Sequence, residues 1–171
     1  MKASTWRKLD HLARQLTPFT LTFLLVLLDA VPLRIPHLQP ISPAWPLIAV
    51  FYWILYRPDL MPPAAAFLLG LTQDTLSGAP LGVHAAIFVL AHLGITTQRR
   101  FFLGKSFAVL WLGFALLALC AFVLKWLLLT LFYLVVASPL PLALQMVVTI
   151  GCFPLLFWGL SRVQASLIDH G

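Results

Sequence analysis

Long apolar segments with short polar interruptions run along almost the whole chain. Proline, glycine and charged residues divide it into six such segments, at about 18–33, 44–56, 60–77, 83–98, 106–136 and 141–160. A membrane-spanning helix needs about 20 mostly apolar residues. The strands of a membrane barrel would alternate apolar and polar residues, and these segments do not. The pattern predicts an all-α integral membrane protein with six transmembrane helices and short loops.

The first residues form a different pattern. Trp6, Leu9, Ala13 and Leu16 recur at helical spacing, with basic residues largely off that face. We expect an amphipathic helix over 4–16 that lies along the cytoplasmic membrane surface, with a frayed charged tail as the alternative. No small-x-small cleavage site follows the first apolar run, so a cleavable signal peptide is not expected. The predicted organisation is a cytoplasmic segment over 1–17, a membrane domain over 18–161 and a cytoplasmic tail over 162–171.

Composition excludes the other broad classes. Charged residues make up 9% of the chain and hydrophobic residues 61%, whereas average proteins carry about 25% charged residues. A soluble domain could not cover its surface with so few charges. A disordered chain would be poor in the apolar and aromatic residues that dominate here. Only a polytopic membrane protein fits.

The basic residues indicate orientation. The net charge is +6, but the eleven basic residues are scattered between apolar segments, so no nucleic-acid partner is expected. With the N-terminus inside and six crossings, Arg34 alone lies outside and Lys125 lies within a span. Nine lie in the cytoplasm: Lys2, Arg7, Lys8, Arg14, Arg57, Arg99, Arg100, Lys105 and Arg162. The positive-inside rule therefore predicts that both termini are cytoplasmic.

Residues that support chemistry are few. Cys120 and Cys152 stand alone in apolar runs, which fits neither a disulfide framework nor a metal site. His84 and His92 share one side of the fourth segment without a carboxylate or thiol on it, so we expect hydrogen-bonded interior histidine and no metal or cofactor. An intramembrane enzyme that uses Ser77 or Asp74 with His84 is the weaker alternative, since no oxyanion donor can be named.

Ionisable residues inside spans need an explanation, because each costs roughly 2.5–3.5 kcal/mol to insert. Helix geometry places Asp29, Asp74 and Lys125 in the outer half of the membrane. A structural ion pair that holds helices together is the favoured interpretation, with Lys125 as its cation and Asp29 or Asp74 as its anion. If Asp74 does not pair with Lys125, we expect it to be hydrogen-bonded to backbone at the Ser77-Gly78 turn. A proton or ion pathway and a Lys125 side chain that reaches the outer headgroups are the alternatives.

The third segment carries the most informative face. Ala66, Gly70, Asp74 and Gly78 recur every four residues and form a small-xxx-small ridge with a carboxylate in it. Small residues let helix backbones approach closely. Gly78, Pro80 and Gly82 then predict a tight reversal, with Ser77 beside it. These residues, together with Asp29 and Lys125, are the candidates for helix packing or for binding a partner.

The run from Gly70 to Gly82 resembles the central motif of the bacterial rod shape-determining protein MreD family. Four further features of the sequence agree with this resemblance: Asp29 before the first proline-rich loop, Tyr52-Trp53 ending the second span, Gln98-Arg99-Arg100 after the fourth, and Pro154 inside the last helix followed by Arg162 near the C-terminus. The resemblance covers nearly the whole chain. The N-terminal part and Lys125 depart from the family pattern.

The resemblance implies a non-catalytic component of the machinery that elongates rod-shaped cells, in the bacterial inner membrane. The implied partners are the single-pass protein MreC and, through it, the MreB filament. The RodA glycosyltransferase and its transpeptidase, which build lateral peptidoglycan, are implied as indirect partners. The alternative is the substrate-binding component of an energy-coupling-factor vitamin transporter. That class also has six helices, but it uses small residues on the first helix, where this chain offers only Ala30.

Overall fold

The computed structural model describes residues 2–30, 42–136 and 138–168, and the side chains of 16–30, 42–136 and 138–166. Helices account for nearly all of these residues, and they contain no strand. The elements are α1 (Lys2–Ala30), α2 (Trp45–Tyr56), the 3-10 turn η1 (Pro58–Leu60), α3 (Pro63–Ser77), α4 (Val83–Phe102), α5 (Phe107–Tyr133) and α6 (Leu140–Ile168). Each of the six predicted segments corresponds to one helix, so the all-α prediction is confirmed.

The two terminal helices are longer than the sequence predicted. The segment 4–16, expected as a separate helix, is the first part of α1. No glycine interrupts residues 2–30, and Pro18 is accommodated inside the helix. The hydroxyl of Thr22 donates to the Pro18 carbonyl at 2.7 Å, in the turn that follows this proline. α6 likewise continues to Ile168 through Pro154. The boundaries at 17 and 161 remain predictions.

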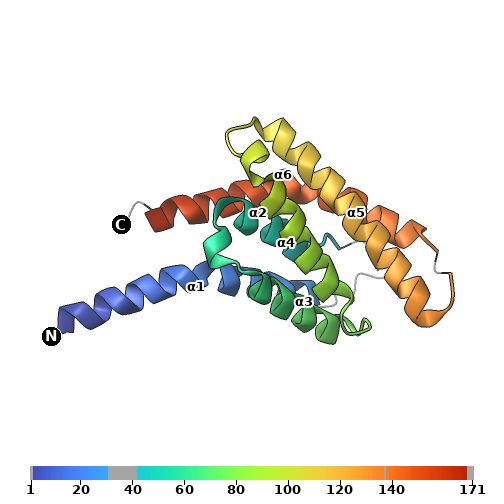
Figure 1. Ribbon diagram of the computed structural model, residues 1–171, viewed down its shortest axis with the longest axis horizontal. Coiled ribbons are helices and arrows are strands. Elements are labelled where there is room, and N and C mark those ends of the chain that lie inside the picture. The colour runs from blue at the N-terminus through green and yellow to red at the C-terminus, as the bar shows by residue number, and fades with distance from the viewer. Residues whose placement is uncertain (1, 31–41, 137, 169–171) are drawn as a thin grey trace.

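The helices run in alternating directions around a central one. Figure 1 shows that the described ends of α1 and α6 lie on the same side of the molecule, and that α4 and α5 diverge from a shared end. α2 contacts α1, α4 and α6, and every residue from Pro46 to Leu55 is buried. A helix buried on all sides has no polar face, which is why this short segment is apolar throughout.

An aromatic cluster joins three helices in the core. The Phe51 ring of α2 lies 5.4 Å from the Phe114 ring of α5 and 5.7 Å from the Phe153 ring of α6. The Phe114 and Phe153 rings stack with centroids 4.4 Å apart. Edge-to-face and stacked aromatic pairs add stabilisation beyond the area they bury. The cluster therefore fixes α5 and α6 against α2.

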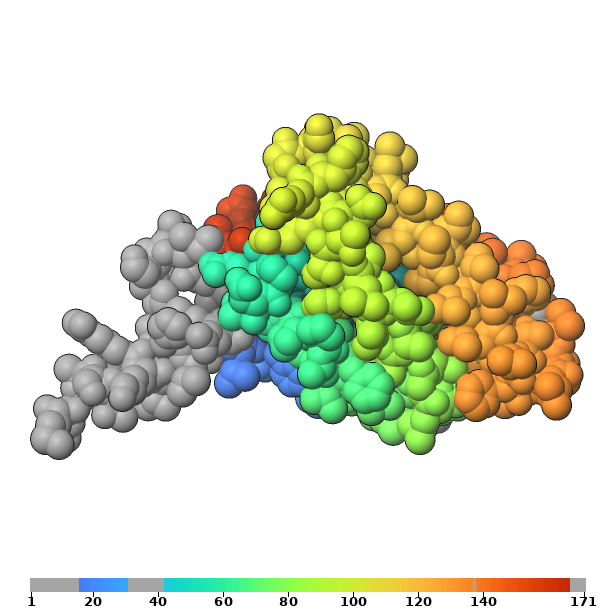
Figure 2. Space-filling model, in the orientation of Figure 1, coloured from blue at the N-terminus to red at the C-terminus, as the bar shows by residue number. Residues whose placement is uncertain are grey.

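Two helices, α5 and α6, are long and apolar enough to cross a membrane, with mean hydropathies of 2.7 and 2.0. Residues 16–30 and 45–56 form shorter apolar helices. The outer surface of α5, which forms one edge of the molecule in Figure 2, is rich in exposed leucines, with Leu112 67% and Leu116 64% exposed. Such a surface suits hydrocarbon and not water.

Candidate functional site

The ridge on α3 brings two backbones into direct contact. A Cβ built on Gly70 would lie 2.4 Å from Cα and 2.5 Å from the backbone nitrogen of Ala85 on α4. Ala66 and Asp74, one turn to either side on the same face, are both fully buried. No side chain larger than hydrogen fits between the two helices at Gly70. This contact positions the rest of the site.

The reversal between α3 and α4 depends on two glycines. Gly78 has φ = 67° and Gly82 has φ = 104°, which are left-handed conformations that other residues adopt only with strain. A Cβ on either glycine would meet nothing within 4 Å, so backbone conformation and not space selects glycine here. Pro80 accepts a hydrogen bond from the Val83 N–H at 3.3 Å, and α4 begins there.

Asp74 caps the N-terminus of α4 from the neighbouring helix. Its Oδ1 accepts the backbone N–H of His84 at 2.9 Å and a hydrogen bond from Nδ1 of the same residue at 2.8 Å. Its Oδ2 accepts the N–H of Gly82 at 2.8 Å and that of Ala85 at 3.4 Å. The first N–H groups of a helix have no partner within it, and the helix dipole favours an anion there. Gly82, at the usual capping position, has no side chain to do this.

The expected ion pair between Asp74 and Lys125 is therefore wrong. Within the described part of the chain, the basic side chain within 4 Å of Asp74 is the His84 ring. No ion pair within 4 Å reaches Lys125 there, although Asp29 and Asp74 are the acidic groups that act on its charge. Depth along the helices suggested the pair, but both oxygens of Asp74 already have partners on α4. The position of Asp74 could have indicated its true partner, because the small-residue face of α3 holds Asp74 against the start of α4.

Asp29 is held by two other polar groups. Ser42 Oγ donates to its Oδ1 at 3.2 Å and Gln73 Nε2 donates to its Oδ2 at 2.7 Å. These bonds connect α1 to α3 and to the segment before α2. Gln73, which is 5% exposed, was not among the residues that the sequence singled out. It lies next to Asp74 in the same motif.

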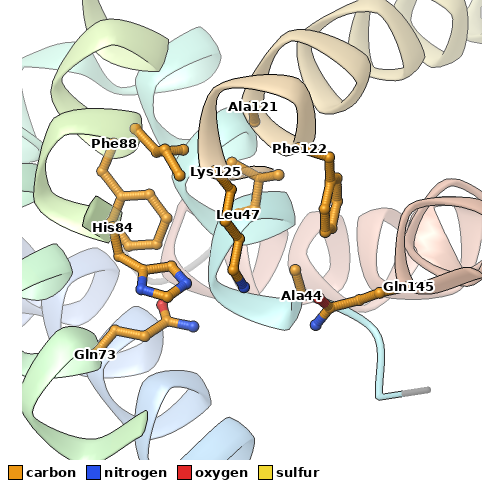
Figure 3. Close-up of a pocket in the computed structure, with 10 residues that line it drawn as sticks. Ala44, Leu47, Gln73, His84, Phe88, Ala121, Phe122, Lys125 and Gln145 are labelled. Carbon is orange, nitrogen blue, oxygen red and sulfur yellow. The ribbon is translucent and has the colours of Figure 1, made fainter. Parts of the chain in front are cut away.

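Lys125 reaches into a pocket between the helices. Figure 3 shows its side chain descending from α5 between Gln73 and His84 on one side and Ala44 and Gln145 on the other. The pocket has a cavity volume of about 30 Å³, which is room for a water molecule or two. Its lining comes from five elements of the fold: Ala44, Leu47, Gln73, His84, Ile87, Phe88, Ala121, Phe122, Lys125 and Gln145. It is the place where the polar groups of α3, α4, α5 and α6 come together.

The remaining polar candidates are bound to backbone. The hydroxyl of Ser77 donates to the Gln73 carbonyl of its own helix at 2.7 Å. Of the two pairs that the enzyme alternative names, Asp74 with His84 is formed and Ser77 with His84 is not. His92 Nε2 lies 3.0 Å from the Met61 carbonyl oxygen, as expected of an interior hydrogen-bonded histidine. No group of three potential metal ligands forms among the described residues.

Comparison with known proteins places this geometry in context. The family described as rod shape-determining protein MreD matches residues 11–163. The rod shape-determining protein MreD of Haemophilus influenzae is 30% identical over 92 residues, which are 51% of this chain and 52% of that protein. An uncharacterized protein of Rickettsia prowazekii is 29% identical over 131 residues, 76% of this chain and 74% of its own. The match thus spans about half of the Haemophilus protein. No solved structure matches.

Proposed function

Because this chain belongs to the MreD family of rod shape-determining proteins, we propose that it is a non-catalytic membrane scaffold of the cell-elongation machinery. The match over residues 11–163 carries this proposal. The geometry supports it, because the carboxylates of the site hold helices in place. Asp74 caps α4 and Asp29 ties α1 to α3. A scaffold needs such fixed helix positions.

The proposed topology is six crossings of the bacterial inner membrane with both termini in the cytoplasm. Two observations support it. Consecutive helices alternate in direction, and α1 starts on the side of the molecule where α6 ends. The α4–α5 turn, which contains Lys105, lies at the opposite end of α4 from the Gly78–Gly82 reversal. The reversal thereby faces outward and the basic turn inward, in accord with the positive-inside rule.

Cysteine labelling in intact cells tests this topology. With Cys120 and Cys152 replaced by serine, a cysteine at Ala79 is expected to react with an impermeant maleimide, and one at Gly104 to react only after lysis. Cysteine at Gln39, which lies outside the described residues, is expected to behave like the one at Ala79. Labelling of the Gly104 position in intact cells would refute the proposed topology.

The proposed partner is an MreC-like single-pass protein, which would link the chain to an MreB filament and to a RodA glycosyltransferase with its transpeptidase. The outward end of α5 supports a protein partner. Leu131 is 69% exposed, Leu134 86% and Val136 74%. This end continues past the length that a hydrocarbon core of about 30 Å requires, because 27 residues of helix extend about 40 Å. Apolar surface beyond lipid requires a cover.

Depletion in the native host tests the function. Cells that lose the protein are expected to become round, and extra MreC-like protein alone should not restore the rod shape. Copurification of the tagged full chain from native membranes should recover the single-pass partner. Rod-shaped cells with a vitamin requirement would instead favour the transporter component.

A further inference from the structure

Pro154 interrupts the hydrogen-bond pattern of α6 near the middle of the helix. Proline has no backbone N–H, so the carbonyl of Ile150, four residues earlier, has no backbone partner within the helix. Gly151 lies in the same turn and is exposed, and a Cβ on it would meet nothing within 4 Å. Glycine lowers the stability of a helix, and proline is the commonest site of a bend. Residues 150–154 are therefore a weak turn in α6.

A side chain of α5 takes the place of the missing N–H. The indole Nε1 of Trp111 donates to the Ile150 carbonyl oxygen at 3.0 Å. The indole nitrogen acts only as a donor, and in hydrocarbon a carbonyl that proline has freed needs a donor from a neighbouring helix. Trp111 is 39% exposed, so its ring is not a core side chain. The bond joins the two helices at the position where proline leaves α6 one hydrogen bond short.

The part of α6 that follows this turn is fixed to two other helices. The Phe153 ring stacks on the Phe114 ring of α5 with centroids 4.4 Å apart. The Phe157 ring lies 5.3 Å from the Tyr52 ring of α2, and the Tyr52 hydroxyl donates to Gln164 Oε1 at 2.7 Å. This part of the helix is therefore held both by ring packing and by a hydrogen bond.

The part of α6 that precedes the turn is anchored elsewhere. Thr149 Oγ1 accepts the N–H of Ala44 at 2.9 Å, and Gln145 Nε2 donates to the Ser42 carbonyl at 3.0 Å. Both bonds lead to the short segment at the start of α2. Much of the apolar surface here is open, with three side chains between 41% and 65% exposed: Leu140, Leu144 and Val147. The two parts of α6 are thus attached to different structures, and residues 150–154 join them.

We propose that α6 is a hinged helix and that the bond from Trp111 to Ile150 is the latch that keeps the hinge closed. With the bond made, residues 140–150 keep the position seen here. Without it the Ile150 carbonyl has no donor, and 140–150 move relative to the part that the aromatic cluster holds. A few residues such as 150–154 can absorb the change in backbone angles that a hinge requires. The hinge goes beyond the proposed scaffold function, to which it adds one movable element among fixed helices.

Thermal unfolding of the detergent-purified full chain tests the latch. Trp111→Phe keeps an aromatic ring and removes the donor, so it should lower the melting temperature by roughly 2–12 °C. Pro154→Ala returns an N–H to the helix, and in that background Trp111→Phe should change the melting temperature little. The matched control is Trp158→Phe, at a tryptophan of α6 that is 61% exposed, whose effect should be the same with proline or alanine at 154. An equal loss for Trp111→Phe in both backgrounds would overturn the latch.

Distances between pairs of spin labels, measured by pulsed electron paramagnetic resonance, test the hinge itself. In a full chain whose two native cysteines are replaced by serine, one label stands at Leu68 of α3 and the other at Leu144 or at Leu155, all of them exposed positions. Trp111→Phe should broaden or shift the 68–144 distance distribution and leave the 68–155 distribution unchanged. Adding Pro154→Ala should restore the 68–144 distribution. An unchanged 68–144 distribution in Trp111→Phe, or equal broadening of both pairs, would overturn the hinge.

Discussion

Replacement of Gly70 by leucine will separate α3 from α4 and leave little folded protein in the membrane. The atoms that a Cβ would meet are backbone atoms, with Ala85 Cα at 2.4 Å, Ala85 N at 2.5 Å and the His84 carbonyl carbon at 2.7 Å. Side chains can change rotamer to relieve overpacking, at a cost of about 1–3 kcal/mol. A helix backbone has no rotamer to change, so the cost of a side chain at Gly70 exceeds about 1–3 kcal/mol. For the same reason Gly70→Ala is expected to destabilise the protein.

Two variants provide controls for this prediction. A Cβ on Gly94, in the exposed middle of α4, would meet nothing within 4 Å, so Gly94→Ala should leave stability unchanged or raise it by up to about 1 kcal/mol. Leu71→Ala, on another face of α3, should cost less than either Gly70 variant. The yield of monodisperse protein and its melting temperature in detergent report the order. Equal yields for Gly70→Leu and Leu71→Ala would show that the two backbones do not depend on this contact.

The helices could be predicted because their limits are set by local chemistry. Pro62 and Pro63 begin α3, since proline fits the first turn of a helix where no N–H partner is needed. Gly78 ends it in a left-handed conformation. Uninterrupted apolar residues between such signals have one stable form in hydrocarbon, which is a helix. The small-residue ridge was visible for a related reason, because its period is that of the helix.

The partners of the polar groups could not be predicted in the same way. Sequence reasoning matched Asp74 with Lys125 because both carry charge at a similar depth, but depth does not fix which side of a helix faces which neighbour. Backbone N–H groups at the start of α4 compete for the carboxylate, and the sequence does not show that these groups lie next to Asp74. Gln73 was missed because the sequence analysis selected residues by charge, and a neutral amide is recognised as important only once Asp29 is seen to accept its hydrogen bond. The pocket depends on all of these placements at once.

Asp74→Asn is expected to destabilise the protein by roughly 2–6 kcal/mol, because two backbone N–H groups of the α4 N-terminus lose their acceptor. The asparagine amide keeps one acceptor oxygen for α4. Its NH₂ group would face the N–H groups of Gly82 and Ala85, which now donate to Oδ2. Two donors at the helix N-terminus then remain buried without partners, and each costs about 1–3 kcal/mol. Asp59→Asn, at an exposed carboxylate in η1, should change the melting temperature little.

The double variant distinguishes this cap from an ion pair. If Asp74 stabilised the fold by pairing with Lys125, then Lys125→Met would be costly alone and would recover much of the Asp74→Asn loss, because no orphan charge would remain. The cap predicts the opposite. Lys125→Met alone costs little, since no bond to Lys125 exists in the described structure, and the double variant melts as low as Asp74→Asn. Thermal unfolding in detergent of the two single variants and the double variant decides between the cap and the ion pair. Substantial recovery in the double variant would mean that Asp74 is stabilised by the charge of Lys125 and not by the start of α4.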